Sequence, residues 1–428
     1  MKQAFQKWST IWHVRDARLV LLASSLATLA LGLSMVALLL RVHSSGAGPY
    51  AVTALLLCVS LPTILTMGLA GSLADRIDSR RLLVASLLVQ SVALGGLALR
   101  DDLPATFALT ALGTLAGSLG MPVWTTILPH LAGEEHTARL VSAYQGLRSL
   151  AMPAGAGLAG VAVQAWGDSS ALGLAAALTF MAAMVPLAVR TRRIPHAAEP
   201  VTVLPFSALR ILRGHRVAFV LVLALVPFIV AVEAVNAVEV FLVRDVLGAS
   251  PALFGLSAVA GGIGAVLGAF AAGLVLDPGR RVPVTLAALG LTAATQVAQG
   301  LAPGFAVFLV LCLVIGAAIG LANALIVVVI LDETPERARG RVIALVSGLA
   351  RSGSVAATVL GGGLVAGLGP RLAFVTTGSL GLLTAVTAAY AVHRGASDRG
   401  SSTRGSGDRG SSSPRERVEA SDEVPAGY

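Results

Sequence analysis

Long apolar runs separated by short polar segments recur along the chain. A helix needs roughly 17 to 25 apolar residues to cross about 30 Å of hydrocarbon. Twelve runs approach or exceed that length and predict twelve transmembrane helices, at residues 19–40, 51–73, 82–99, 105–128, 140–163, 171–189, 217–243, 252–276, 282–298, 306–331, 342–368 and 372–392. The first run follows four basic residues, as a signal peptide would, but it is too long for one and eleven more runs follow. We therefore expect an uncleaved first helix.

Composition supports the same class of protein. Hydrophobic residues make up 56% of the 428 residues and charged residues only 12%, whereas a soluble globular domain carries about 25% charged residues. The net charge of +9 would suggest nucleic-acid binding in a soluble chain, but the basic residues lie between the apolar runs. Cys58 and Cys312 fall inside runs and lack partners at metal-ligand spacing. We expect an integral membrane protein without metal, cofactor, disulfide or nucleic-acid partner.

The distribution of Lys and Arg predicts the orientation of the helices. With the N-terminus inside, 19 basic residues face the cytoplasm before the tail and four face outward: Arg41, Arg100, Arg244 and Arg371. Cytoplasmic loops retain positive charge, so both termini are expected there. The predicted organisation is a cytoplasmic segment 1–18, six helices in 19–189, a cytoplasmic linker 190–216, six helices in 217–392 and a disordered tail 393–428. Arg outnumbers Lys 29 to 2, which indicates a GC-rich bacterial gene and a bacterial inner membrane.

The two halves of the chain repeat each other. Pro49 and Gly71 frame the second run, and Pro251 and Gly273 frame the eighth, with an offset of 202 residues at both landmarks. Each half also carries a charged loop before a helix with an internal arginine, Arg148 in the first half and Arg351 in the second. We expect two pseudo-symmetric six-helix bundles.

The segment after the second run carries a recognisable motif. Its residues are Gly71, Leu73, Ala74, Asp75, Arg76, Arg80 and Arg81. Together with the repeat, they resemble the major facilitator superfamily of transporters over residues 19–392, although Asp78 and Ser79 depart from that family's Gly and Arg. The resemblance implies a substrate site between the halves at mid-membrane. It also implies a conformational latch made by Gly71, Asp75, Arg76 and Arg80. Alternatively, these charges only set topology, above all at Asp78 and Arg81.

Glu233 is the clearest ionisable residue inside a predicted span, about 25 Å from the cytoplasmic start of its helix at 1.5 Å per residue. Asn236 lies three residues on, shares its face and is a candidate to line the substrate cavity. A lone carboxylate in hydrocarbon can gain and lose a proton near neutral pH. Glu233 is therefore a candidate proton-coupling residue, or else a static partner of an arginine such as Arg41. Glu239 is expected near the outer surface, in contact with water.

Four further residues are candidates to line the substrate cavity. Arg148 and Arg351 lie about 15 Å deep in the fifth and eleventh helices, and Gln145 and Trp124 lie close to them. Together they would bind an anionic or hydrogen-bonding substrate. The alternatives are that the arginines reach the cytoplasmic surface and that the tryptophan anchors its helix at the interface.

The fifth helix suggests a direction of transport. Pro153 and Gly157, in a stretch rich in glycine, resemble a feature of exporters in the superfamily, and the loop 332–341 resembles that of macrolide-efflux and siderophore-exporter relatives. We therefore expect a proton-coupled antiporter, not an enzyme and most simply a monomer, that exports an amphipathic antibiotic or siderophore. The alternatives are simple helix packing at Pro153, and a lysolipid translocator or metabolite importer of the same fold.

Overall fold

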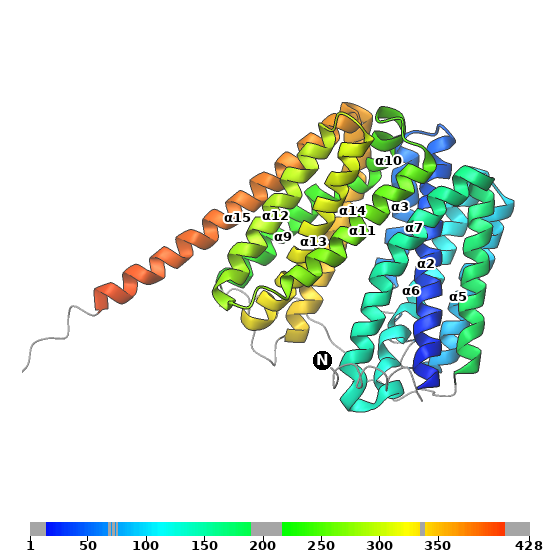
Figure 1. Ribbon diagram of the computed structural model, residues 1–428, viewed down its shortest axis with the longest axis horizontal. Helices are drawn as coiled ribbons and strands as arrows, with labels where there is room; N and C mark the ends of the chain where they lie inside the picture. Colours follow the sequence, from blue (N-terminus) through cyan, green and yellow to red (C-terminus); the bar gives the residue numbers. More distant parts are fainter. Residues whose placement is uncertain are drawn as a thin grey trace, which may run out of the picture.

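A computed structural model describes residues 14–66, 70, 73, 76–189, 216–333 and 339–406. Regular structure in this part of the chain is helical throughout, with no strand (Figure 1). The predicted linker lies outside the described residues except for Arg216. The elements are α2 (Arg15–Ser44), α3 (Pro49–Leu65), α5 (Ser79–Leu99), α6 (Leu103–Thr126), α7 (Leu128–Met184), η1 (Val185–Ala188), α9 (Arg216–Glu233), η2 (Ala234–Ala237), α10 (Glu239–Phe241), η3 (Leu242–Val246), α11 (Pro251–Ala272), α12 (Pro278–Gly300), α13 (Phe305–Glu333), α14 (Arg339–Leu368) and α15 (Pro370–Ser406).

These helices account for the predicted spans. Within the described residues, nine helices are long and apolar enough to cross a membrane, and the pair Val222–Ala237 and Glu239–Val246, bent by 44°, makes a tenth. One of the nine, Thr137–Ala188, is 52 residues long and covers the fifth and sixth predicted spans. α7 turns back at Gly167, which has a φ of 83°. Glycine adopts such a positive φ without the steric cost that other residues have. The shorter apolar helix α3 covers residues 51–65 of the second predicted span. The predicted all-helical fold is confirmed.

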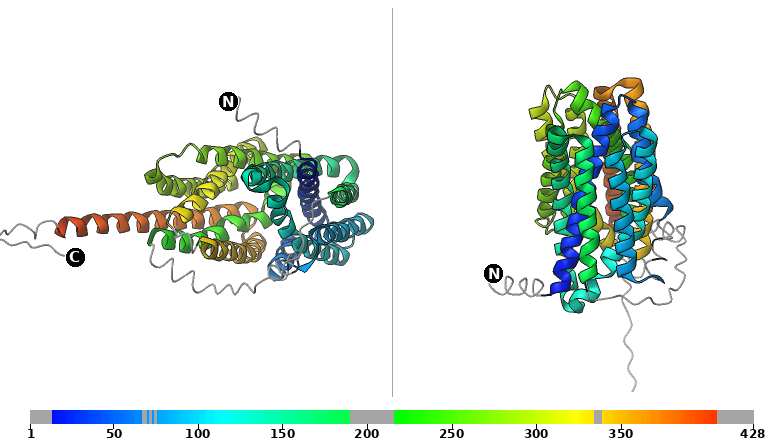
Figure 2. Two further views of the ribbon diagram at one scale, coloured as in Figure 1. Left: turned by 90° about the horizontal axis from the view of Figure 1, so that it is seen from below. Right: turned by 90° about the vertical axis from the view of Figure 1, so that its right-hand side faces the viewer.

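The helices form two groups that lie side by side (Figure 1). α2 packs on α7, and α5 packs on α6 and α7, in the first group; α12 packs on α13 and α15, and α9 on α14 and α15, in the second. Two helix pairs join the groups, α7 with α11 and α3 with α14. In Figure 2, α15 projects beyond the second group. This is the predicted pair of six-helix bundles.

The turns preserve the repeat that the sequence predicts. Gly46 and Gly248 have φ values of 71° and 62°, and Gly167 and Gly369 have φ values of 83° and 77°. Each pair is separated by the same 202 residues as Pro49 and Pro251. A positive φ favours glycine. Equivalent turns in the two halves therefore have the same backbone conformation and the same residue type.

At one end of the molecule the two groups meet at a pair of equivalent residues. His43 Nε2 at the end of α2 lies 2.9 Å from Asp245 Oδ1 in η3, and these positions are also 202 residues apart. The His43 ring packs edge-on against Phe241, with 5.2 Å between the ring centroids. Equivalent residues can touch only where the pseudo-twofold axis passes between them, so the axis emerges at this pair.

Glycine allows α7 and α11 to approach closely. A Cβ at Gly160 would lie 2.5 Å from the Pro251 carbonyl oxygen, and a Cβ at Gly255 would lie 2.7 Å from the Ala156 carbonyl oxygen. Both obstacles are backbone atoms, which cannot rotate away as a side chain can. One turn away, Pro153 packs on Gly262, while α7 stays helical through Pro153. The contact follows the small-residue rule of membrane helix pairs.

Arg41 connects the carboxyl end of α2 to two other helices. Its side chain is 4% exposed and forms an ion pair with Asp168. It also donates to Ser169 Oγ at 3.0 Å and to the carbonyls of Leu97 and Arg100 at 2.6 and 2.8 Å. These carbonyls end α5 and lack partners in their own helix. The hypothesis that Arg41 pairs with Glu233 is therefore wrong.

The carboxyl end departs from the prediction of a disordered tail. α15 continues to Ser406, and Arg394 stacks on the Tyr390 ring, with 4.9 Å from the guanidinium carbon to the ring centroid. A helix that is already nucleated extends without a new nucleus, so a polar composition alone does not end it. Disorder from residue 393 is therefore wrong for residues 393–406. It stays a prediction for residues 407–428, which lie outside the described residues.

Arg41→Met should lower the free energy of unfolding by about 3 kcal/mol, because Asp168 and two carbonyls lose their buried donor. Unfolding in mixed detergent micelles would measure the change. Arg100→Met, at an exposed arginine of the same surface, serves as the matched control. An equal effect of the two substitutions would rule out the stabilising role of Arg41.

Gly160→Ala should lower the free energy of unfolding by about 2 kcal/mol, because the added methyl group separates two backbones. Gly146→Ala on the same helix meets nothing within 4 Å and should raise it by about 0.5 to 1 kcal/mol, as expected for glycine in an open helix position. The same unfolding assay compares them. A change of the same sign in both variants would contradict the close packing of α7 on α11.

Candidate functional site

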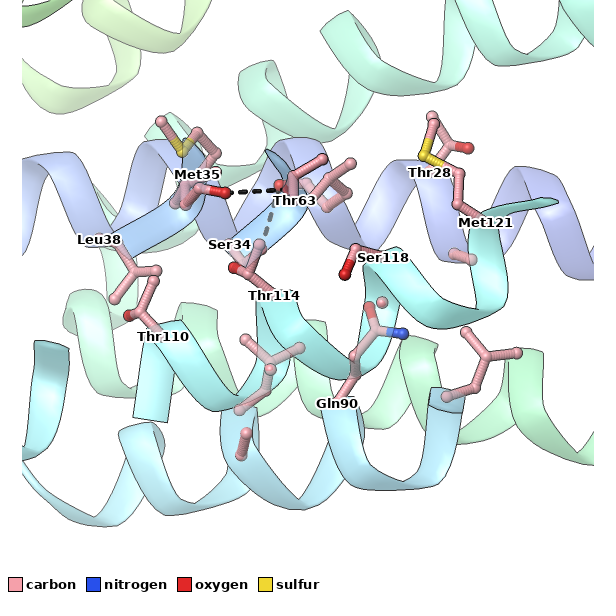
Figure 3. A pocket seen from close by; sticks show the side chains of 18 of the residues that line it. Thr28, Ser34, Met35, Leu38, Thr63, Gln90, Thr110, Thr114, Ser118 and Met121 are labelled. Carbon is pink, nitrogen blue, oxygen red and sulfur yellow. Dashed lines mark hydrogen bonds between the residues drawn. The ribbon is translucent and has the colours of Figure 1, made fainter. Parts of the chain in front are cut away.

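A cavity of about 240 Å³ lies inside the first helix group, between α2, α3, α5, α6 and the amino-terminal half of the first span of α7. It is elongated along the helices: its wall on α6 runs from Leu109 to Trp124, about 22 Å at 1.5 Å per residue. Figure 3 shows Leu38 and Thr110 at one end and Met121 towards the other. The sequence predicted a cavity between the halves, whereas this cavity belongs to the amino-terminal bundle.

Hydroxyl groups line the middle of the cavity, and most of them already donate a hydrogen bond to a backbone carbonyl. Ser24, Thr28, Ser34 and Thr63 donate to carbonyls of their own helices at 2.8–3.1 Å. A hydroxyl has one proton, so these groups offer only acceptor lone pairs to a ligand. The wall therefore accepts hydrogen bonds along most of its length.

One end of the cavity carries a cation. Arg148 Nη1 donates to Tyr144 Oη at 3.0 Å, and Trp124 lies beside them in the wall. Tyr144 is 2% exposed and fixed in the core, which holds the half-buried guanidinium in place. Within the described chain, no carboxylate forms an ion pair with Arg148.

The cavity gathers some of the predicted residues but not others. Arg148 and Trp124 line it. Gln145, Asn236 and Arg351 are exposed and are not part of its wall. Their role in lining a substrate cavity stays a prediction.

Sequence reasoning missed the polar wall itself. Thr110, Thr114 and Ser118 follow one another at intervals of four residues in an apolar helix, and Gln90 faces them from α5 (Figure 3). Residues four apart share a helix face. That spacing is a sequence signal for a polar stripe, although it contains no charged residue.

Glu233 lies where α9 passes into the 3₁₀ helix η2. Its side chain is half-buried, and no hydrogen bond or ion pair of its carboxylate is found within the described chain. Asn236 points to an exposed surface. Glu239 is partly buried, and its Oε1 lies 3.3 Å from Ser257 Oγ, whose nearer acceptor is the Phe254 carbonyl at 2.7 Å, so the expected contact with water is replaced in part by contact with a protein hydroxyl.

The predicted latch is only partly described. Gly71 and Asp75 lie outside the described residues; Arg76 is exposed, and Arg80 donates to the Leu187 carbonyl. Asp78 caps α5, since its Oδ1 accepts from the amides of Arg80 and Arg81 at 2.9 and 3.2 Å.

The second half has a similar cap, although at the 202-residue offset Asp277 corresponds to Asp75 and not to Asp78. Asp277 Oδ1 accepts from the Gly279 amide at 2.9 Å at the start of α12. The residue that departs from the family motif, Asp78, thus has a structural explanation that the topology alternative did not include. Among the described residues, no group of three His, Cys, Asp or Glu side chains could hold a metal ion.

Comparisons with known proteins agree with this architecture. The family model described as Major Facilitator Superfamily matches residues 20–242 and 234–419. An uncharacterized MFS-type transporter of Bacillus subtilis (strain 168), YfiS, is 24% identical over 369 residues, which cover 81% of this chain and 87% of the relative. The nucleoside transporter NupG superposes with a TM-score of 0.72 at 13% identity and covers 88% of this chain and 99% of its own.

The human organic anion transporter TETRAN superposes with a TM-score of 0.61 at 16% identity, over 87% of this chain and 99% of its own. At such identities the likeness extends to the fold alone. The family model, however, spans most of the chain. The protein therefore belongs to the Major Facilitator Superfamily of membrane transporters.

Proposed function

We propose that this transporter exports an amphipathic small molecule across the cytoplasmic membrane of a bacterium in exchange for protons, with both termini in the cytoplasm. The observation that carries the proposal is the glycine contact between α7 and α11. The sequence resemblance associates such a stretch with exporters. A glycine-lined contact holds the two bundles together at the outer side and lets them slide when the transporter opens.

The similar proteins do not identify the substrate of this transporter. The names of structurally similar proteins refer to nucleosides and to organic anions, and the relative from Bacillus subtilis is uncharacterized. The choice of an amphipathic substrate rests on the cavity, which combines leucine and methionine side chains with hydroxyl groups along its length.

Glu233 is the proposed proton-coupling residue. An ionised carboxylate without a cation partner is costly inside a membrane, and binding a proton removes that cost. Glu233 lies at a break between two helical geometries, where the backbone can change conformation with little loss of hydrogen bonding. Protonation and movement can therefore be linked at one place.

Everted membrane vesicles with an acidic interior should accumulate amphipathic antibiotics or siderophores from a defined panel, whereas vesicles lacking the protein should not. Glu233→Gln should reduce the accumulation driven by the pH gradient at least tenfold, because an amide cannot carry the proton. Mass spectrometry of pelleted vesicles measures the uptake.

Glu239→Gln is the comparison variant six residues along, and its amide can still contact the Ser257 hydroxyl. Accumulation that survives Glu233→Gln but not Glu239→Gln would move the proton site to Glu239. Accumulation only when the exterior is acidic would overturn export in favour of import.

Thr114→Phe should fill the cavity. In a variant whose other tryptophans, Trp8, Trp12 and Trp166, are replaced by phenylalanine, the filled cavity should reduce quenching of Trp124 fluorescence by acrylamide at least twofold and abolish transport. Leu115→Phe is the control, since this neighbour is 40% exposed and is not part of the wall. Unchanged quenching in Thr114→Phe would show that the cavity does not give access to Trp124.

A further inference from the structure

The chemistry of the cavity wall narrows the class of ligand. Among the described residues that line it, Arg148 is the one ionised side chain, and there is no carboxylate. A guanidinium stays charged in proteins, and here its one partner that we identify is the neutral hydroxyl of Tyr144. A cation in such a cavity would meet repulsion from Arg148 and no compensating charge.

The opposite end of the cavity holds a polar atom without a partner. Thr110 is 6% exposed, and its Oγ1 has no hydrogen bond within the described chain. A buried hydroxyl that lacks a partner costs about 1 to 3 kcal/mol. Unlike Ser24, Thr28 and Ser34, Thr110 keeps its proton available (Figure 3). It therefore adds a free donor and acceptor at the far end of the slot.

We propose that the cavity binds an elongated amphipathic organic acid, with its anionic group on Arg148, hydroxyl or amide N–H groups donating to the wall, and a hydrogen-bonding group at Thr110. This inference deepens the proposed function by naming the substrate class of the same transporter. The length of the slot favours a single extended chain, because Thr110 and Trp124 are 14 residues apart along α6, about 21 Å. Cationic amphipaths are excluded by charge.

Three probes with one skeleton test the charge preference: decanoylglycine as the anion, its methyl ester as the neutral form, and N-(2-aminoethyl)decanamide as the cation. Binding to the purified full-length protein is followed by Trp124 fluorescence in the background without the other tryptophans, with Trp124→Phe as the blank. Decanoylglycine should bind at least tenfold more tightly than the ester, and the cation more weakly than the ester.

Arg148→Ala should weaken decanoylglycine binding at least tenfold and change ester binding less than twofold, because only the anion loses its charge partner. Arg148→Lys should retain part of the preference, since lysine keeps the charge without the planar fork. Arg280→Ala removes one exposed positive charge from the other bundle and controls for net charge. Equal binding of the anion and the cation, or an unchanged anion affinity in Arg148→Ala, would overturn the proposal.

Thr110 is tested separately with ω-hydroxydecanoylglycine. Its terminal hydroxyl should improve binding at least threefold over decanoylglycine in the parent protein, and Thr110→Val should abolish this gain while binding of decanoylglycine persists. A gain that survives Thr110→Val would remove Thr110 from the site. These measurements use no pH gradient, so a failure of proton-coupled export would leave the binding result standing, and a failure of binding would leave the export result standing.

Discussion

Hydrocarbon offers the peptide backbone no hydrogen-bond partner, and this constraint shapes the whole molecule. Each span satisfies its amides within a helix, so side chains have to satisfy what remains at the helix ends. Arg41 does so for the last carbonyls of α5, and Arg371 for the carbonyls of Gly300 and Ala302 at the end of α12. In both bundles an arginine thus donates to carbonyls at the end of a helix, but the arginine lies on α2 in the first bundle and on α15 in the second.

The same constraint explains why the cavity wall is rich in acceptors. A hydroxyl in an apolar helix donates its hydrogen bond to a carbonyl of the preceding turn, as Thr28 and Ser34 do. Arg148 at one end and Thr110 at the other keep donors free, and between them the second amide proton of Gln90 does so as well. The polar groups of this wall therefore mostly accept hydrogen bonds and seldom donate them. A count of polar residues would not show this difference.

Much of the fold could be predicted from the sequence, because span length and turn residues are local properties. The starts of α3 and α11 at Pro49 and Pro251 and the helical class are confirmed. The partner of Arg41 could not be predicted, since Asp168 lies 127 residues away and only packing brings it close. The cavity inside the amino-terminal bundle could not be predicted for a similar reason: composition indicates polar positions, but the three-dimensional arrangement decides which helix faces converge. The substrate site between the halves, which the resemblance implies, stays a prediction. The continuation of α15 was missed because helix extension depends on the preceding turn as well as on composition.

The contact between His43 and Asp245 bears on how the molecule arose. A single six-helix chain that associated with its own copy would set identical side chains against each other at the symmetry axis, where two aspartates repel. An unlike pair at that point can be encoded only after the gene has been duplicated and the two copies have diverged. The chemical asymmetry of this pair thus dates it as a later acquisition than the duplication itself, whereas the shared glycine turns are inherited from the ancestor.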